Sequence, residues 1–495
     1  MNRSITTASR RLGVIALCAF VGLGGLPMVP TVGEAAADFG AGQSARYNKN
    51  VNGDFLMVGN TVLNCSGSNC TTNSTTNDDL NMANNDPDGN GALFNGSSAT
   101  FTIPSGAVVD AAYLYWGGNL GTTRSNGTEY YCSDNHAEVS NATANKSSAN
   151  TVRMKVGAGA YTTVTANTVY TVPSGGLAQA LPSGSSDDGL VYEGVTDVTA
   201  ALSTVAAATA TTVSVANVQT MQGENCHAGW SLTVVYRFPT LNCLTGANDD
   251  AGAGANHRND YRNVAIYDGL IQQQNGAADT TTTLSGFLTA SPGPVALRLG
   301  VLAWEGDQFL DEDQMKVKSN LSGSSTTVNP AGPSGTDNFF DSGKQVSADH
   351  NADLDADPDS GASIAQGYSG GRGDGHGIDA KTQVVQVPGG TSSIDVTFTT
   401  DRDNYYAGQF ALSSPLKCLL IVEKDQAVNG TAVGRDNSTS PSPYVKSGDL
   451  LTYTMPVRVA GDVDLNNVTI SDSIPAGTTF VPGSLSVGKG QTSAA

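Results

Sequence analysis

The chain is poor in charge, and above all in basic residues. Of its 495 residues only 14% are charged, against about 25% in ordinary soluble domains. Lys and Arg together number 25, whereas Asp and Glu number 45, so the formal net charge is −20. A surface with this balance repels phosphate backbones and anionic lipids, so we expect no nucleic-acid partner.

Long hydrophobic runs are also missing, except at the N-terminus. Residues 12–29 read LGVIALCAFVGLGGLPMV, with arginines before this run and three alanines at 35–37 after it. A basic stretch, an apolar stretch and a small-residue site in this order predict a signal peptide over residues 1–37. No later segment is long and apolar enough to cross a bilayer. We therefore expect a secreted, extracellular or cell-envelope protein whose mature chain has no membrane span.

Two recognisable catalytic motifs are absent. The sequence contains no HExxH and no phosphate-binding loop. The best carboxylate pair is Glu305 and Asp307 in AWEGD (303–307). On a strand, residues two apart share a face at about 7 Å between α-carbons, a spacing that a retaining glycosidase could use. A polar strand end is the simpler interpretation, so we expect no catalytic residue and no enzymatic activity. A hydrolase that uses Glu305 or Asp307 is kept as an alternative.

The cysteines agree with export. One of the seven, Cys18, falls in the predicted signal peptide, and an even number in an oxidising compartment favours disulfides. Six cysteines allow 15 pairings. Without a CxxC motif or a histidine at ligand spacing, a metal site is a weak alternative. The pairing that we predict is Cys65–Cys70, Cys132–Cys226 and Cys243–Cys418.

What the sequence does contain is a series of β-strand patterns. Segments rich in β-branched and aromatic residues, several with period-two alternation, are separated by Gly, Pro, Asn and Asp. They predict an all-β protein built from antiparallel β-sandwiches. One short helix is expected within 192–205, capped by Asp197 or Thr199. The predicted strands are 98–104, 108–118, 151–157, 211–219, 230–238, 263–271, 295–304, 382–387 and 393–400.

The chain is too long for one hydrophobic core, because cores rarely grow past about 250–300 residues. The clearest change of pattern lies near residue 414, where CLLIVEKD starts a new strand series. We expect a large β-sandwich region over 38–413 and a further domain over 414–495. Loop-like sequence at 240–262 is the place where the large region would divide, if it consists of two subdomains.

The final segment resembles a known family. VEKD (422–425), SGDLLTYTMPVRV (447–459) and NNVTISDSIPAGTTFVPGSLSV (466–487) are similar to the conserved-repeat domain of bacterial surface proteins, known as domain of unknown function eleven. The resemblance implies an immunoglobulin-like β-sandwich that serves as a spacer. The family pattern continues beyond Val487, which suggests a truncated domain here.

The large region also carries a resemblance. Its segments at 77–118, 215–239, 264–270, 284–307 and 338–343 look like the N-terminal region that precedes such repeats in actinobacterial surface proteins. That likeness implies a cellular context and an architecture, and no assigned activity.

Two acidic loops are candidate calcium sites. Calcium binds six to eight oxygens, and loops dense in Asp, Asn and backbone carbonyls can supply them. Neither loop has the glutamate that an EF-hand places at position twelve. Solvated acidic turns are the alternative, so we expect no cofactor or, at most, structural calcium. The candidate ligands are Asp353, Asp355, Asp357 and Asp359 in DLDADPDSG, and Asp86, Asp88 and Asn90 in DPDGNG.

Whether the tryptophans are buried or exposed distinguishes a structural role from a sugar-binding role. Trp116 and Trp230 are flanked by strand-patterned apolar residues, so we expect both in the core, although exposed they could stack on sugars. The sequence as a whole predicts a structural surface protein without enzymatic activity, a sandwich head on a spacer repeat. The first alternative is an adhesin for cell-wall or host-surface glycans or proteins, with its binding site in loops such as 319–380.

Overall fold

The structure is a computed structural model. It describes residues 33–34, 45–66, 81–85, 92–123, 130–132, 145–183, 189–239, 261–291, 293–307, 312–328, 339–340, 362–364, 377–416, 420–422, 425–433, 445–455, 457–459, 474 and 477–485.

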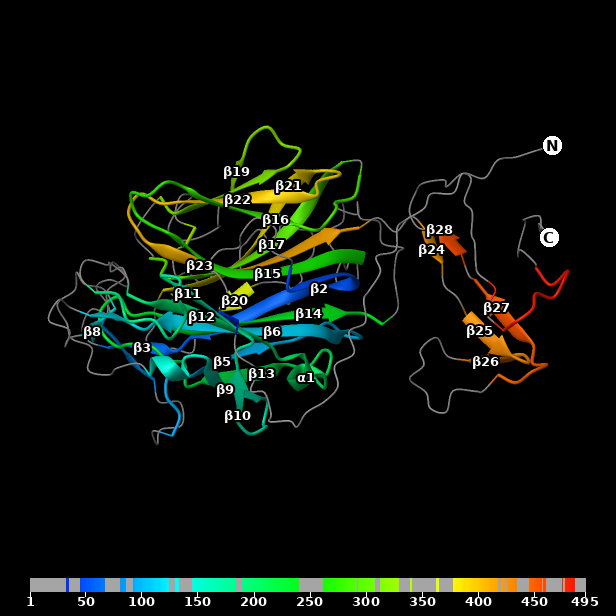
Figure 1. Cartoon of the computed structure of the whole chain (residues 1–495), viewed down its shortest axis with the longest axis horizontal. Coiled ribbons are helices and arrows are strands. Elements are labelled where there is room, and N and C mark those ends of the chain that lie inside the picture. Colours follow the sequence, from blue (N-terminus) through cyan, green and yellow to red (C-terminus); the bar gives the residue numbers. More distant parts are fainter. Residues whose placement is uncertain are drawn as a thin grey trace, which may run out of the picture.

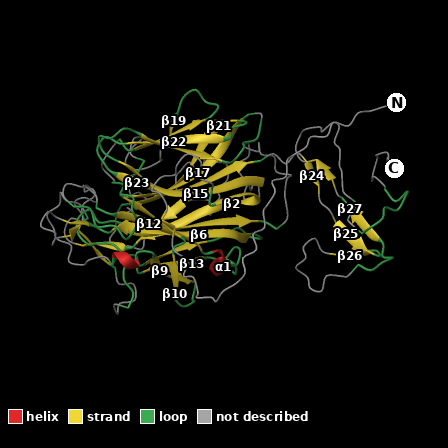
Figure 2. Cartoon of the chain, in the orientation of Figure 1, coloured by secondary structure: helices red, strands yellow, loops and turns green. Residues whose placement is uncertain are grey.

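This part of the chain is almost entirely β-structure (Figure 2). The described helical residues form one turn of α-helix, α1 (Thr199–Leu202), and a 3₁₀ turn at Lys146–Ser148. The turn α1 lies in the segment expected to hold a short helix, and the Asp197 carboxylate accepts the backbone N–H of Thr199. Each of the nine predicted strands overlaps an observed strand. The all-β prediction is therefore confirmed.

The largest sheet runs through both halves of the large region (Figure 1). Its neighbouring strands are antiparallel apart from the short β1 and β20, which pair in parallel with β11 and β2. Its order is β1 (Gly33–Glu34), β11 (Thr168–Val172), β12 (Val191–Asp197), β6 (Val108–Asn119), β14 (Ala228–Arg237), β2 (Tyr47–Thr61), β15 (Tyr261–Gln273), β23 (Tyr405–Pro415), β17 (Pro294–Trp304) and β21 (Ile378–Pro388), with β20 (Ala362–Ile364) on β2.

Two four-stranded sheets cover this large sheet on opposite sides (Figure 1). The first consists of β10 (Thr162–Thr165), β9 (Thr151–Val156), β13 (Thr211–Ala216) and β5 (Ser97–Phe101). The second consists of β16 (Thr280–Ser285), β22 (Ser393–Thr399), β18 (Gln314–Ser319) and β19 (Thr326–Val328).

The large sheet is folded onto itself along β2. Residues 47–52 of this strand pair with β15, and residues 53–61 pair with β14. Strands β12 and β17 are six positions apart in the sheet order, which would place them about 29 Å apart in a flat sheet. Yet the Trp304 indole on β17 donates a hydrogen bond of 2.9 Å to Glu193 on β12. The two halves of the sheet therefore face each other.

The result is four layers with three hydrophobic cores between them. The alternation of β6 shows the principle: Leu114 and Trp116 enter the core under the first small sheet, whereas Tyr113 and Tyr115 enter the central core. A third core lies between the second half of the large sheet and the second small sheet. Because both faces of the large sheet are covered, its central strands are buried along most of their length.

The two halves have the same strand order. In chain order β2, β5, β6, β9, β10, β12, β13 and β14 correspond to β15, β16, β17, β18, β19, β21, β22 and β23. Numbered one to eight within a half, the strands pair as 1-8-3-6 in one sheet and 2-7-4-5 in the other. This is the strand order of an eight-stranded jelly roll. The large region is thus a pair of jelly rolls that share the folded sheet.

Smaller elements complete the described chain. Strand β3 (Leu63–Ser66) pairs with β4 (Asn81–Asn84), and β7 (Thr122–Thr123) pairs with β8 (Tyr130–Tyr131). After residue 416, two small antiparallel sheets follow. One pairs β24 (Leu420–Val422) with β28 (Val457–Val459), and the other is β26 (Thr431–Val433), β25 (Asp425–Val428) and β27 (Leu451–Thr454).

Candidate functional site

Several residues that the sequence singled out lie outside the described part of the chain. Neither calcium loop is described, so Asp353, Asp355, Asp357 and Asp359, like Asp86, Asp88 and Asn90, stay predictions. The same holds for Cys70, Cys243 and Cys418, and for the side chain of Cys65.

One predicted disulfide is confirmed. Cys132 and Cys226 are bonded, with their α-carbons 5.2 Å apart. Both are buried in the first core. The bond ties the residue after β8 to the segment before β14, 94 residues further along the chain.

The tryptophans are core residues, as predicted. Trp116 and Trp230 are fully buried, and so is Trp304. Their indole nitrogens have partners: Trp116 donates to the carbonyl of Ala149, and Trp230 donates to the Ser97 hydroxyl. None of the three can present a face to an external sugar.

The carboxylate pair Glu305 and Asp307 follows the end of β17, in agreement with a polar strand end, and does not have the same-strand geometry that the hydrolase alternative assumed. Strand β17 ends at Trp304, and Glu305 has a φ of 76°, in the left-handed region that ends a strand. Its N–H bonds to the carbonyl of Gly377, which turns the chain toward the interior. Glu305 is 2% exposed and Asp307 is fully buried.

Tertiary structure adds a third carboxylate to this pair. Oxygens of Glu305, Asp307 and Asp403 lie within 4.8 Å of one another, all buried. Asp313 and Asp379 are buried in the same region of the second half. Asp403 could not be joined to this group from the sequence alone. It lies about a hundred residues further along the chain, in the link between β22 and β23.

Lys381 and the rings of Phe340 and Tyr405 lie in the same region as these acids. Lys381 on β21 is fully buried, with its ammonium 3.0 Å from the Asp379 carboxylate, and it also donates to the carbonyl of Phe339. The rings of Phe340 and Tyr405 stack at 4.3 Å between centroids. Burial, together with the charges of Asp313 and Asp403, raises the pKa of Tyr405 well above its usual value. The two carboxylates therefore add to the effect of burial on Tyr405.

The acidic group has the chemistry of a hard-cation site. Buried charges are usually paired or coordinate a metal, and carboxylate oxygens are the donors that calcium prefers. Glu305, Asp307 and Asp403 could supply three or more of the six to eight oxygens that calcium takes. Their burial also separates them from any external substrate.

Other buried charges hold the folded sheet together. The guanidinium of Arg46 pairs with Asp268 at 2.6 Å, and the Tyr170 hydroxyl donates to the same carboxylate. Where β2 crosses between the halves, Asp54 lies 3.3 Å from Arg298 and 3.5 Å from Arg262. Burial alone would raise the pKa of Asp54, but the two arginines outweigh it and lower that pKa. These pairs are structural, because they bridge segments far apart in the chain.

Glu193 differs from Asp54, because its pKa is raised and not lowered. Burial is the main cause that raises its pKa well above the usual value, and the nearby Asp268 adds to the shift. The hydrogen bond from Trp304 and the charge of Arg46 oppose it. The raised pKa favours the neutral form of Glu193, which would be an uncharged polar contact from β12 to Trp304 on β17.

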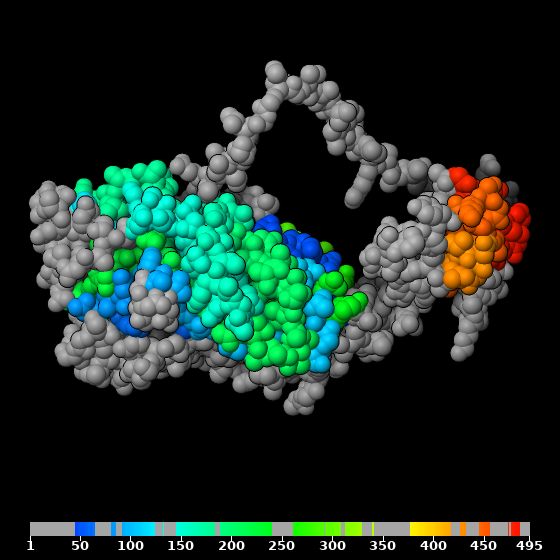
Figure 3. Space-filling model, turned by 90° about the horizontal axis from the view of Figure 1, so that it is seen from below, coloured from blue at the N-terminus to red at the C-terminus, as the bar shows by residue number. Residues whose placement is uncertain are grey.

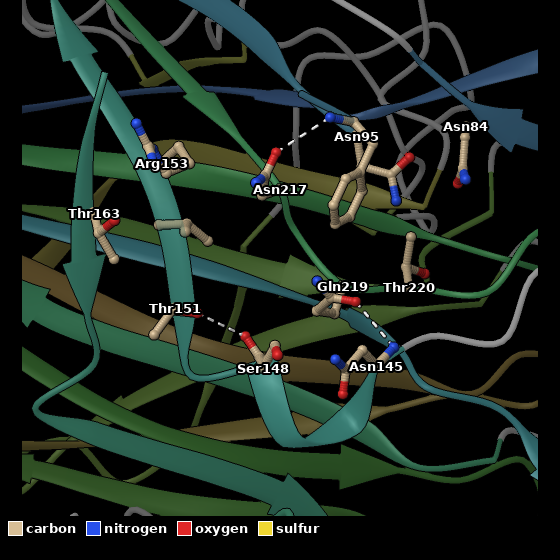
Figure 4. A pocket seen from close by; sticks show the side chains of 12 residues that line it. Asn84, Asn95, Asn145, Ser148, Thr151, Arg153, Thr163, Asn217, Gln219 and Thr220 are labelled. Atoms are coloured by element: carbon tan, nitrogen blue, oxygen red, sulfur yellow. Dashed lines mark hydrogen bonds between the residues drawn. The ribbon is translucent and has the colours of Figure 1, made fainter. Parts of the chain in front are cut away.

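A cavity of about 550 Å³ lies in the first half (Figure 4). It forms where the segments before β5 and β9 meet the segment that links β13 to β14, beside β9 and β10. Half-exposed Phe94 and Arg153 take part in its lining. Five carboxamide side chains line it: Asn84, Asn95, Asn145, Asn217 and Gln219.

Two segments clasp each other to build one wall of this cavity. The N–H of Phe94 donates to the side chain of Asn217, whose own N–H bonds back to the carbonyl of Phe94. The Asn95 amide donates to the carbonyl of Val218. Asn95 and Asn217 have φ values of 43° and 64°, which Asn tolerates better than most residues. In Figure 3, residues 145–183 and 189–237, cyan to green, cover much of the face that is drawn.

The cavity and the acidic group occupy corresponding places in the two jelly rolls. Each is bordered by the segment before the fourth strand and by the link between the seventh and eighth strands. In the first half these segments carry amides and hydroxyls, whereas in the second half they carry Asp313 and Asp403. Corresponding segments therefore border an open cavity lined mainly by uncharged side chains in the first half and a buried acidic group in the second half.

No family model matches the chain, and no curated protein matches it. Among the solved structures that align with it is one titled "Crystal Structure of the STIV MCP", at 13% identity over 64% of this chain and 92% of that one, with a TM-score of 0.17. Another is an atomic structure of Sulfolobus Turreted Icosahedral Virus, at 12% identity over 65% and 90%, also with a TM-score of 0.17. Scores this low carry no argument about function.

Among the described residues, no helix has the length and apolar character needed to span a bilayer.

Proposed function

We propose that the chain is a secreted or cell-envelope structural protein without enzymatic activity, in which a head of two jelly rolls is followed by a spacer repeat. The observation that carries this proposal is the interior position of Glu305 and Asp307, the carboxylate pair singled out in the sequence. Glu305 is 2% exposed and Asp307 is fully buried, so a polymeric substrate has no access to them. A hydrolase built on them would need an open cleft with both carboxylates facing it.

Export is supported by the N-terminal pattern and by the disulfide. Disulfides form and persist mainly in oxidising compartments, and Cys132–Cys226 bridges 94 residues of the first half. The basic, apolar and small-residue order of residues 1–37 provides the route. Cell-wall or host-surface glycans and proteins are the partners that such a location offers, and the acidic net charge argues against nucleic acid.

Structural calcium belongs to this proposal. The acidic group Glu305, Asp307 and Asp403 would hold the cation in the interior, where it would offset carboxylate repulsion and contribute stability rather than activity.

One experiment tests location and inactivity together. The full chain is expressed with its own N-terminus in the source organism. The exported fraction is examined by N-terminal sequencing and by protease treatment of intact cells. We expect a mature terminus near residue 38 and a protein accessible from outside. A chain kept in the cytoplasm with reduced Cys132 and Cys226 would contradict export. A glycan-hydrolysing activity that Glu305→Gln abolishes without changing the melting temperature would contradict the structural role.

A further inference from the structure

We propose that the cavity beside β9 and β10 binds a neutral oligosaccharide. This inference goes beyond the structural role of the protein and does not depend on export, since it rests on the chemistry and geometry of the cavity itself. At about 550 Å³, the cavity falls within the range of about 300–1,000 Å³ that is usual for small-molecule sites.

The lining matches the hydrogen-bonding needs of a sugar. Each hydroxyl of a sugar ring both donates and accepts, and so does each carboxamide, which carries an acceptor oxygen and a donor nitrogen side by side. Five carboxamides and four Ser or Thr hydroxyls line this cavity. A neutral, donor-and-acceptor ligand can therefore be satisfied from several sides at once.

An apolar surface accompanies these polar groups. Phe94 is half-buried in the cavity lining, and Val152 on β9 belongs to the same lining. The C–H face of a sugar ring can pack against an aromatic ring while its hydroxyls reach the surrounding amides. A site of this kind combines apolar contact with a few oriented polar groups, as ligand sites generally do.

The described lining is almost free of charge. Among the described residues that line the cavity there is no Asp, Glu, His, Lys or Cys, and Arg153 is the one charged side chain. The guanidinium of Arg153 already donates to the carbonyl of Tyr161. One partly engaged cation on a chain of net charge −20 is a poor match for a polyanion. The described lining therefore favours an uncharged glycan as the ligand.

The cavity is held in shape before any ligand arrives. The clasp between residues 94–95 and 217–218 fixes one wall, and Gln219 accepts the backbone N–H of Asn145 across the opposite side (Figure 4). The buried Oδ1 of Asn95, in a side chain 1% exposed, has no hydrogen-bond partner within the described structure. Rigid walls lower the entropy cost of binding. Exposed Asn84, Asn145 and Thr163 mark the open side.

A matched pair of variants tests the site. Thr163→Arg places a long charged side chain at the mouth of the cavity, on the exposed edge strand β10. The control, Thr326→Arg, makes the same change at an exposed position of β19, the strand that corresponds to β10 in the second jelly roll. A milder variant, Asn84→Ala, removes one exposed amide from the lining. Melting curves establish that all three variants are folded.

The full-length chain is screened on an array of neutral glycans built from hexoses, pentoses and N-acetylhexosamines. Heparin hexasaccharide and inorganic phosphate serve as anionic probes. We expect at least one neutral glycan to bind. Thr163→Arg should weaken that binding by about tenfold or more, and Asn84→Ala by a few-fold, while Thr326→Arg leaves it unchanged. The proposal fails if no neutral glycan binds, if Thr163→Arg binds as well as the wild type, or if heparin or phosphate competes for the site.

Discussion

Single buried titratable residues decide how this protein responds to pH. Glu193 and His227 are both fully buried, and burial shifts both pKa values toward the neutral form. The consequences for stability have opposite signs. A carboxyl with a raised pKa binds its proton more tightly in the folded state, whereas a histidine with a lowered pKa binds its proton less tightly there.

For Glu193, stability is expected to fall as the pH rises. Below the usual pKa of 4.5 the side chain is protonated in both states, and above it the unfolded chain releases a proton that the folded chain keeps. The loss is at most about 1.4 kcal/mol per pH unit. Glu193→Gln stays neutral and can still accept from Trp304, so it should gain stability relative to the wild type between pH 5 and 8. Urea unfolding across this range measures the difference, with the exposed Asp401→Asn as control. A difference that does not change with pH would contradict the assignment.

For His227, stability is expected to fall as the pH drops. Burial lowers its pKa from 6.5 to about 3, so between these values the unfolded chain takes up a proton that the folded chain rejects. His227→Leu removes this group and should flatten the decline in melting temperature between pH 6.5 and 5, above the range in which most carboxylates titrate. Equal slopes for variant and wild type in that window would show that His227 does not carry the effect.

At the scale of elements, the disulfide Cys132–Cys226 links segments that are far apart in the chain. Closing a loop of 94 residues is expected to stabilise the first half by roughly 2–5 kcal/mol, because it restricts the unfolded chain. The double variant Cys132→Ser, Cys226→Ser should lose that amount in urea unfolding. Reduced wild-type protein should lose at least that amount under the same conditions, because reduction breaks every disulfide in the chain. Stability unchanged by both treatments would mean that the bond constrains little.

The acidic group between β17, β21 and β23 predicts a response to calcium. A cation that binds only the folded state raises stability with its concentration, by about 2.7 kcal/mol at a hundred times its dissociation constant. We expect millimolar calcium to raise the melting temperature relative to chelator. The variant Glu305→Gln, Asp307→Asn should abolish the calcium response. Identical melting curves with calcium and with chelator would remove calcium from the proposal.

At the scale of the whole molecule, the two jelly rolls are one folding unit. Strand β2 hydrogen-bonds to β14 in one half and to β15 in the other, and the central core takes side chains from both. An engineered cleavage site between residues 239 and 242 keeps Cys243 and Cys418 on the same fragment. The cut chain should run as a single particle in size-exclusion chromatography and native mass spectrometry. Two separately folded fragments would show that the halves are independent domains.

The sequence by itself determined that this protein is built from β-strands. Period-two patterns such as VVDAAYLYWGG and VALRLGVLAW predicted buried strands, because alternation records which face of a strand meets a core. The same local reasoning predicted the burial of Trp116 and Trp230. The count of cysteines and the inferred compartment predicted disulfides but left the pairing open, and the choice of Cys132 with Cys226 is confirmed by the structure.

Only the tertiary structure decided how these strands combine. The long strand β2 was not predicted from the sequence. Polar and apolar residues are mixed in YNKNVNGDFLMVGNT, because one part of the strand pairs with β15 and the other part pairs with β14. Asp403 joins Glu305 and Asp307 only after β22 and β23 bring it there. The amide-lined cavity likewise gathers residues 84 to 219 from separate segments. Local patterns report burial, whereas contacts between distant segments depend on the pairing of whole strands, which no local pattern encodes.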